Sequence, residues 1–190
     1  MRVDPEARTA RVQAGVLWGE LDRESQAFGL ATTGGFVSHT GVAGLTLGGG
    51  IGWLHRMHGL TIDQVLSVDV ITAEGELVKA SQTENPDLCW GLRGGGGNFG
   101  IVTEFEFRLH HVGPIVLAGP IYWPMEKAPD LLRFYREWIA EAPDELTTIL
   151  IQRRAPALES VPPELRGSSS CRSHAAMRER SRRGRKLCAR

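Results

Sequence analysis

The chain has 190 residues, and its 22 Lys and Arg balance 22 Asp and Glu. This length predicts one domain or one domain with a further fragment, and the neutral charge gives no electrostatic reason to expect nucleic acid or a membrane surface as a partner. No apolar leader or membrane-length apolar run is present, and the three cysteines lack CxxC spacing, so we expect a cytoplasmic protein with reduced thiols and no metal site.

The first elements in chain order are a short strand at 9–14 and a helix at 18–28. Four residues recur at helical spacing through this helix, namely Trp18, Leu21, Ser25 and Phe28. Gly29 is placed to end the helix, because glycine readily takes the conformation that closes one. A segment rich in glycine follows at 34–52.

The glycine-rich segment, residues 34–52, contains eight glycines. Each glycine costs about 0.5–1 kcal/mol relative to alanine inside a regular element, so bare backbone must serve a purpose here. A flexible linker is one interpretation, but linkers do not carry regularly placed branched residues such as Val42, Leu45 and Ile51. We therefore predict a packed loop whose amides and open Cα positions lie against a large, flat or anionic ligand.

One helical turn is expected next, at 53–59. It carries His55 and His58, three residues apart, a spacing that can place both on one face. Because no third ligand is near, we interpret them as ordinary polar side chains and not as a metal site. Two strands at 67–72 and 77–80 flank a turn that contains glycine, which predicts a β-hairpin.

Asn85-Pro86-Asp87 is typical of a helix start, and Gly94 is placed to stop that helix. A run of glycines leads from it into a half-buried strand at 101–109, whose apolar face is expected to hold Ile101, Thr103, Phe105, Phe107 and Leu109. The glycines match GxGxxG. In a dinucleotide-binding Rossmann unit such glycines follow a strand and precede a helix, whereas here they follow a helix and precede a strand, which argues against a Rossmann site. A P-loop is excluded because GxxxxGK[ST] is absent, and Ser38-His39 lacks the GxSxG elbow of a hydrolase.

A strand at 116–122, an amphipathic helix at 129–142 and a strand at 146–152 complete the regular elements. Because hairpins are present and the elements follow no βαβ order, the predicted fold class is α+β. From 168 the chain becomes rich in arginine, which predicts a disordered basic tail over 168–190. Such a tail can bind nucleic acid or another acidic partner, but we favour a solvated tail or sequence from a shifted reading frame.

Several segments match one known family in the same order. They are Trp18-Gly19-Glu20-Leu21, Gly29-Leu30-Ala31-Thr32, residues 41–50, Glu84-Asn85-Pro86-Asp87-Leu88 and residues 93–103. Together they resemble the second half of the PCMH-type FAD-binding domain of the vanillyl-alcohol oxidase superfamily, and above all bacterial oxidases and dehydrogenases similar to berberine bridge enzyme. The resemblance covers residues 3–167. It implies a partial FAD-binding domain at 1–112, the beginning of a substrate-binding domain at 113–167, and then the tail.

The resemblance implies that residues 38–52 run along the pyrophosphate and ribityl chain of FAD toward the isoalloxazine. The cofactor-binding residues that it implies are Gly34, Gly35, Ser38, His39, Thr40, Gly41, Gly44, Leu45, Gly48, Gly49, Gly50, Gly52 and Val102. Val37 stands where some relatives carry a cysteine that attaches the flavin, so non-covalent FAD is implied. No catalytic residue is identified. Trp53, Tyr122 and Trp123 are candidates for lining a pocket, although we favour core packing for each.

The activity that the resemblance implies is FAD-dependent oxidation. A substrate C–H of an alcohol, sugar or aromatic natural product passes hydride to flavin N5, and oxygen or another acceptor reoxidises the flavin. We expect a small-molecule substrate and no nucleic-acid or membrane partner. The match lacks the earlier half of the FAD-binding domain and the part of the substrate domain that usually supplies the base. The alternatives are therefore an inactive truncated fragment with little or no flavin binding, or a non-enzymatic interaction protein that uses its Arg-rich tail.

Overall fold

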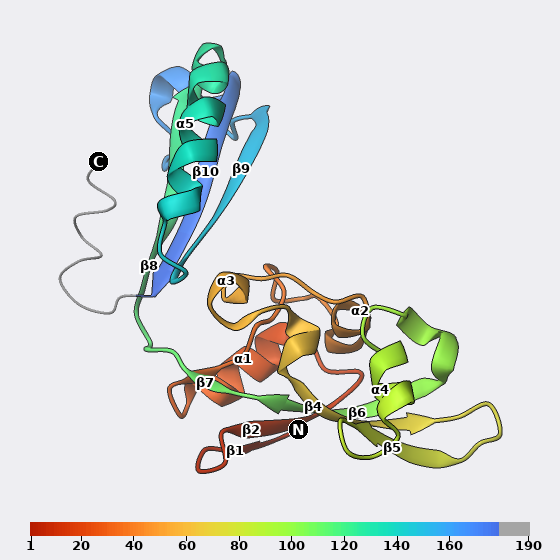
Figure 1. The fold of residues 1–190 in the computed structure, drawn as a ribbon. Coiled ribbons are helices and arrows are strands. Elements are labelled where there is room, and N and C mark those ends of the chain that lie inside the picture. The colour runs from red at the N-terminus through yellow and green to blue at the C-terminus, as the bar shows by residue number, and fades with distance from the viewer. Residues whose placement is uncertain (179–190) are drawn as a thin grey trace. The chain divides into compact units, whose positions relative to one another are not determined.

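The structure, a computed structural model, describes residues 1–178, which fall into two compact units (Figure 1). The first unit comprises Met1–Pro114, and the second begins at Ile115. Both units combine antiparallel sheets with helices, which confirms the predicted α+β class. Within the described residues, no helix is both long enough and apolar enough to span a bilayer.

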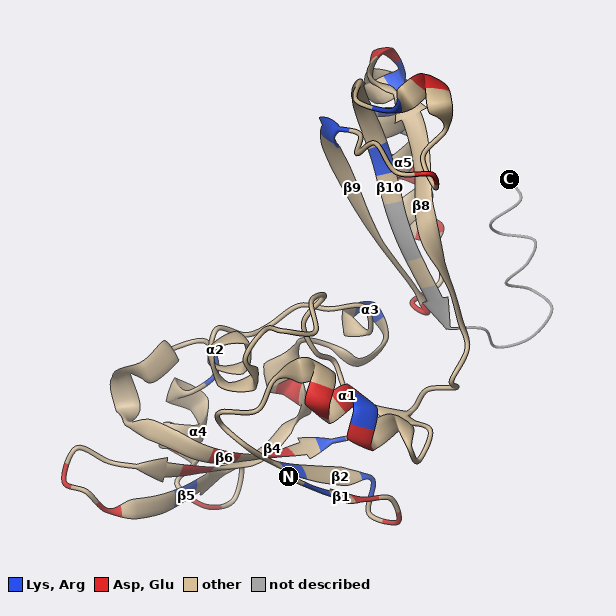
Figure 2. Ribbon diagram, turned by 180° about the vertical axis from the view of Figure 1, so that it is seen from behind, with Lys and Arg blue, Asp and Glu red and all other residues tan. Residues whose placement is uncertain are grey.

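A five-stranded antiparallel sheet forms the base of the first unit, in the order β1-β2-β6-β4-β5. Its strands are β1 (Arg2–Asp4), β2 (Thr9–Gln13), β4 (Val65–Ile71), β5 (Leu77–Ser81) and β6 (Ile101–Arg108). The helices that lie over one face of this sheet (Figure 1) are α1 (Trp18–Gln26), α2 (Val42–Leu47), α3 (His55–His58) and α4 (Pro86–Gly91). The strands of this sheet carry charged residues (Figure 2). Two of them form an ion pair between neighbouring strands, with Arg11 Nη1 of β2 3.1 Å from Glu104 Oε1 of β6.

Shorter elements connect these layers. The strands β3 (Leu30–Ala31) and β7 (His110–His111) pair antiparallel with each other. Two 3₁₀ turns, η1 (Thr61–Gln64) and η2 (Gly96–Phe99), lead into β4 and β6. Because β3 ends just before the glycine-rich segment, its pairing with β7 fixes where that segment begins.

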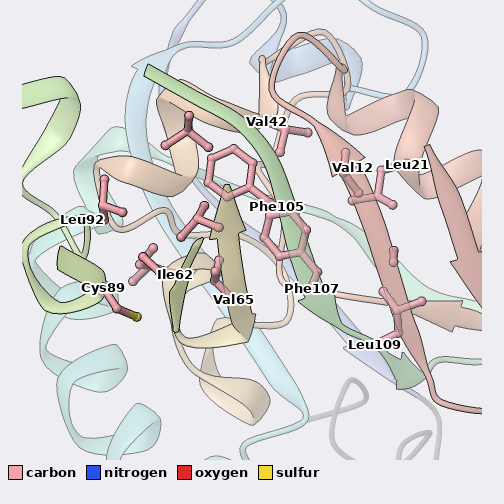
Figure 3. Close-up of a cluster of buried hydrophobic side chains, with 14 of the residues drawn as sticks. Val12, Leu21, Val42, Ile62, Val65, Cys89, Leu92, Phe105, Phe107 and Leu109 are labelled. Carbon is pink, nitrogen blue, oxygen red and sulfur yellow. The ribbon is translucent and has the colours of Figure 1, made fainter. Parts of the chain in front are cut away.

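The core of the first unit lies between its helices and its sheet (Figure 3). Phe105 and Phe107 of β6 are fully buried, as predicted. Trp18 of α1 is also fully buried and packs edge-on against Phe107, with ring centroids 5.8 Å apart. This contact holds the start of α1, and with it the neighbouring glycine-rich segment, against the sheet.

The beginning of β6 differs from the expected alternation. Ile101 and Thr103 were placed on the buried face, but both are exposed and Val102 is buried. The cause is a β-bulge: Val70 of β4 pairs with Val102, while the preceding Asp69 pairs with Glu104, so Thr103 is the extra residue. One inserted residue reverses which side chains face the core before and after it.

The second unit is built on a three-stranded antiparallel sheet in the order β8-β10-β9. Its elements are β8 (Val116–Pro124), η3 (Met125–Lys127), α5 (Ala128–Glu141), β9 (Leu146–Arg154), η4 (Pro163–Leu165) and β10 (Ser169–Arg178). The helix α5 packs on this sheet, since Tyr135 Oη lies 2.6 Å from Thr148 Oγ1 and Trp138 packs beside buried Leu146. The strand and helix positions read from the sequence at 116–152 agree with these elements.

The strand β10 corrects the expectation of a disordered tail over 168–190. Ser169–Arg178 pairs on both sides, with Cys171 opposite Trp123 of β8 and Gln152 of β9. Cys171 is completely buried. A middle strand is held by backbone hydrogen bonds to two neighbours, so its polar composition did not prevent it from folding. Residues 179–190, where the rest of that prediction falls, lie outside the described residues.

Candidate cofactor-binding site

The glycine-rich segment leaves β3 over the indole ring of Trp18. A Cβ added to Gly34 would lie 2.6 Å from Cε3 of that ring, and one added to Gly35 would lie 2.8 Å from Leu45 Cδ1. Real Cβ atoms do not approach other atoms so closely. Packing against the buried indole ring therefore requires glycine at 34, whereas the end of the flexible Leu45 side chain could move to admit a Cβ at 35.

The turn at 38–40 anchors the first turn of α1 through its backbone. The amide of Trp18 donates to the carbonyl of Thr40 at 3.0 Å, and the amide of Gly19 donates to that of Ser38 at 2.8 Å. These bonds satisfy two of the amides that every helix leaves free at its start. The side chains of Ser38 and His39 remain exposed.

The middle of the segment is a helix, where the sequence predicted a loop. In α2, Val42 and Thr46 lie one turn apart and are completely buried, and Thr46 Oγ1 donates to the carbonyl of Val42 at 2.7 Å. The spacing of Val42, Leu45 and Thr46 is typical of a helix, but the glycines between them obscured this pattern. Leu45 packs against the core of the unit.

The opposite side of α2 is bare backbone. Gly41 is the N-cap of this helix, Gly44 lies in its middle and Gly48 is its C-cap. All three are exposed, and their spacing of three and four residues places them on one helix face. We call this surface the glycine face of α2.

Packing does not explain the glycine face. A Cβ added to Gly41 or Gly44 would meet nothing within 4 Å, and neither residue has a positive φ. Alanine therefore fits both positions and would favour the helix at Gly44. Glycine is favoured over alanine at an N-cap such as Gly41, but the described chain gives no reason for glycine at Gly44, which points to something outside it.

The segment returns through two glycines with positive φ, 98° at Gly49 and 75° at Gly50. Their carbonyls accept the amides of Ile62 at 2.9 Å and of Thr61 at 3.0 Å. A side chain on Gly50 would overlap Thr61. This return is thus fixed by backbone conformation and by the start of η1.

The two ends of the segment touch. A Cβ on Gly52 would overlap the carbonyl oxygen of Gly34, so the backbone at Gly52 lies directly against that peptide. Near the two ends, the rings of Phe36, inside the segment, and Trp53, just after it, meet edge to face with centroids 4.8 Å apart. The segment is therefore a closed loop with α2 in its middle.

Polarity in and around the loop suits an anionic or strongly polar group. Residues 34–52 contain no Asp, Glu, Lys or Arg, so no carboxylate of the loop repels a phosphate. Two nearby hydroxyls, Thr33 Oγ1 and Thr61 Oγ1, are buried and make no hydrogen bond to the described residues. An unsatisfied buried hydroxyl costs free energy, which a polar ligand atom within reach would reduce. FAD fits these features: bare backbone to approach and no competing charge.

An acidic group lies on the neighbouring helix. Asp22 of α1 keeps an exposed surface, yet protein atoms around it partly exclude water and raise the pKa of its carboxyl to about 6. It has no basic partner among the ion pairs of the described residues. Likewise, no group of three or more His, Cys, Asp or Glu among the described residues is arranged to hold a metal ion.

The second glycine motif has a structural explanation. The order α4, η2, β6 is the helix, glycines and strand read from the sequence. A Cβ on Gly95 would overlap the carbonyl of Gly91, and one on Gly100, whose φ is 135°, would overlap the carbonyl of Ile71. Val102 is 6% exposed and belongs to the core. Its predicted place beside the cofactor stays a prediction, as does that of the other implied site residues.

Comparison with known proteins supports one family. Residues 1–81 match the family model described as an FAD binding domain. Over 132 residues the chain is 46% identical to the FAD-linked oxidoreductase pgmH of Aspergillus terreus, covering 69% of this chain and 26% of that protein.

Two solved structures share the fold over nearly the whole chain. The 6-hydroxy-D-nicotine oxidase of Arthrobacter nicotinovorans superposes with a TM-score of 0.85 at 29% identity, covering 99% of this chain and 40% of that one. The BBE-like 1 protein of Physcomitrella patens gives 0.84 at 27% identity, with 99% and 38% covered. The chain thus spans well under half the length of these relatives. It belongs to the FAD-linked oxidoreductases that carry a PCMH-type FAD-binding domain and are similar to berberine bridge enzyme.

Proposed function

We propose that this chain forms part of an FAD-dependent oxidoreductase and that residues 34–52 bind FAD without a covalent bond. The observation that carries the proposal is the glycine face of α2. Glycines at 41 and 44 have open space where a side chain would be, and at Gly44, inside the helix, the fold does not need a glycine. A closely approaching ligand does.

The loop would bind the cofactor through its backbone. Peptide amides and carbonyls are its available polar groups, apart from the hydroxyls of Ser38 and Thr40 and the imidazole of His39. Backbone amides can neutralise phosphate oxygens without a cationic side chain. The missing Cβ atoms at Gly41 and Gly44 would let a flat ring or a phosphate lie directly on the peptide planes.

The non-covalent mode rests on position 37. Val37 is 45% exposed, and its aliphatic side chain cannot form a bond to the cofactor. The nearest residues on either side, Phe36 and Ser38, offer no thiol. Cys89 and Cys171 are buried elsewhere in the fold.

Bound FAD would supply the redox chemistry, accepting hydride from a small-molecule substrate and passing the electrons to oxygen or another acceptor. One structural relative is a 6-hydroxy-D-nicotine oxidase, but the described residues do not select one substrate. No base is assigned. The cytoplasmic location and the lack of a nucleic-acid or membrane partner stay predictions from the sequence.

A titration of FAD fluorescence tests the proposal, because quenching reports even weak binding. We compare the wild-type chain with Gly44→Leu, which fills the glycine face, and with Gly113→Leu, which fills an equally open position outside the loop. Leucine favours a helix by up to about 1 kcal/mol over glycine, so Gly44→Leu should fold normally.

We expect Gly44→Leu to weaken FAD binding by at least about tenfold, roughly 1.4 kcal/mol, while Gly113→Leu binds like the wild type. Acid precipitation should release the flavin into the supernatant. Equal affinity in the wild type and Gly44→Leu, or flavin that stays with the acid pellet, would contradict the proposed site or its non-covalent mode.

A further inference from the structure

Two histidines from distant parts of the first unit lie face to face. His58 ends α3, and His110 begins β7. Their rings are stacked with centroids 3.7 Å apart and planes within 7° of each other. Neither histidine belongs to the loop proposed to bind FAD, so the pair needs a separate explanation.

Gln64 of η1 fixes a proton on one of the two rings. Its Nε2 donates to the backbone carbonyl of His58, so its Oε1 is the atom that lies 2.7 Å from Nε2 of His110. Because an amide oxygen only accepts hydrogen bonds, Nε2 of His110 carries the hydrogen. Gln64 is 3% exposed, which keeps this arrangement away from water.

This geometry tolerates one positive charge and resists a second. A neutral pair, or one imidazolium over a neutral ring, keeps the stack and the bond to Gln64. Two imidazolium rings at this distance repel each other, since a nearby like charge disfavours the charged form. Histidine takes up its proton in the mildly acidic range, so acidification is what would force the rings apart.

Charged and titratable groups of both signs lie on the neighbouring elements. On the elements packed against the pair, α3 carries His55 and Arg56, β7 carries His111, and β3 carries no titratable side chain. The carboxylate on these elements is Asp63 of η1. It accepts the amide of Leu60 at 2.9 Å and lies 3.3 Å from Nη1 of Arg93.

We propose that His58 and His110 form an acid-sensitive latch, which holds α3 against β7 at neutral pH and releases it when both rings are protonated. The latch acts next to the closed loop, because the amide of His55 donates to the carbonyl of Gly52 at 3.2 Å. Its release would therefore loosen the end of the loop that touches Gly34. This inference concerns the fold and does not depend on FAD.

Hydrogen exchange of the backbone amides at 53–60, followed by mass spectrometry, tests the latch. After correction for intrinsic exchange, these amides should exchange about tenfold faster near pH 5 than near pH 7.5. His58→Phe keeps an aromatic ring in the stack but cannot take up a proton, so its exchange should not depend on pH. His111→Phe, changed at the neighbouring exposed position, should respond like the wild type.

An NMR titration of the imidazole Cε1–H signals provides a readout that needs no variant. Of the six histidines, His58 and His110 should titrate together in two separated steps. Single, independent titration curves for all six would overturn the latch, as would wild-type exchange at 53–60 that is the same at both pH values or a pH response retained in His58→Phe.

Discussion

At the closed ends of the glycine-rich segment the fold itself excludes side chains, whereas along α2 nothing in the described chain does. A Cβ on Gly34 would press into the Trp18 ring at 2.6 Å, and one on Gly52 would overlap the Gly34 carbonyl. At Gly41 and Gly44 the same atom would meet nothing within 4 Å. The end glycines and the α2 glycines lie in one stretch of sequence and cannot be told apart there. The first are required by close packing, and the second are not.

The difference shows that a glycine-rich sequence is not in itself a binding site. Glycines at the ends of the loop are needed for the chain to close as it does here. Gly44, in the middle of α2, weakens the helix without improving packing. Such positions, costly to stability and unexplained by the fold, are the ones that point to a ligand.

Gly52→Ala should break the closed end and produce the largest effect. The new Cβ has no free space because the Gly34 peptide occupies it, so the backbone must move. We expect a loss of at least about 3 kcal/mol in the free energy of unfolding, as for severe overpacking. Urea denaturation measures it, with Gly113→Ala as the matched control. A loss no larger than that of the control would refute the closed loop.

Gly34→Ala should cost about 1–3 kcal/mol through its overlap with the indole ring of Trp18. A double-mutant cycle with Trp18→Leu sharpens this prediction, because the smaller side chain leaves room for the new methyl group. The double variant should be more stable than the sum of the two single losses implies. Strict additivity in denaturation experiments would mean that the ring is not what excludes a side chain at Gly34.

Gly44→Ala should act in the opposite sense and stabilise the chain by about 0.5–1 kcal/mol, because alanine favours α2 and has open space there. The thermal midpoint in the absence of FAD should therefore rise. With FAD present, the same methyl group should reduce the stabilisation that the ligand provides. A variant that is less stable than the wild type without ligand would show that the glycine face is not free.

Asp22→Asn, in the helix α1, should have the smallest effect on stability. The loop anchors the first turn of this helix. The unfolded carboxyl titrates near 3.8 and the folded one near 6, so the folded state binds the proton more tightly. The stability contributed by that proton is present below about pH 4 and is lost as the pH rises through 6.

The asparagine variant should consequently be more stable than the wild type at pH 7, by less than about 1 kcal/mol because solvent screens this exposed group. The advantage should shrink to nothing as the pH falls to about 4. Thermal denaturation of both proteins across this range measures the difference. A constant difference at all pH values would place its origin outside the titration of Asp22.

Local sequence patterns predicted most regular elements, because apolar spacing and caps are local signals. The helix α1, the hairpin of β4 and β5, and the helix α5 all follow from such spacing. The helix α2 was missed since Gly44 and Gly48 lower its apparent propensity, while the burial of Val42 and Thr46 that stabilises it depends on packing.

The features that the sequence could not predict depend on partners far along the chain. The bulge at Thr103 is set by pairing with β4, and β10 exists because β8 and β9 bracket it. The site residues were named by resemblance. Which of their glycines serve closure and which leave open space became evident only once the positions of Trp18 and the Gly34 peptide were known.

The contact between Gly34 and Gly52 also determines which changes the loop can tolerate. Its two stems are joined backbone to backbone, while between them Val42 and Thr46 are buried and the carbonyls of Ser38 and Thr40 accept the first amides of α1. The side chains at 37–39 are exposed, so substitutions there can alter what the loop contacts, provided that the backbone which anchors α1 through Ser38 and Thr40 keeps its length.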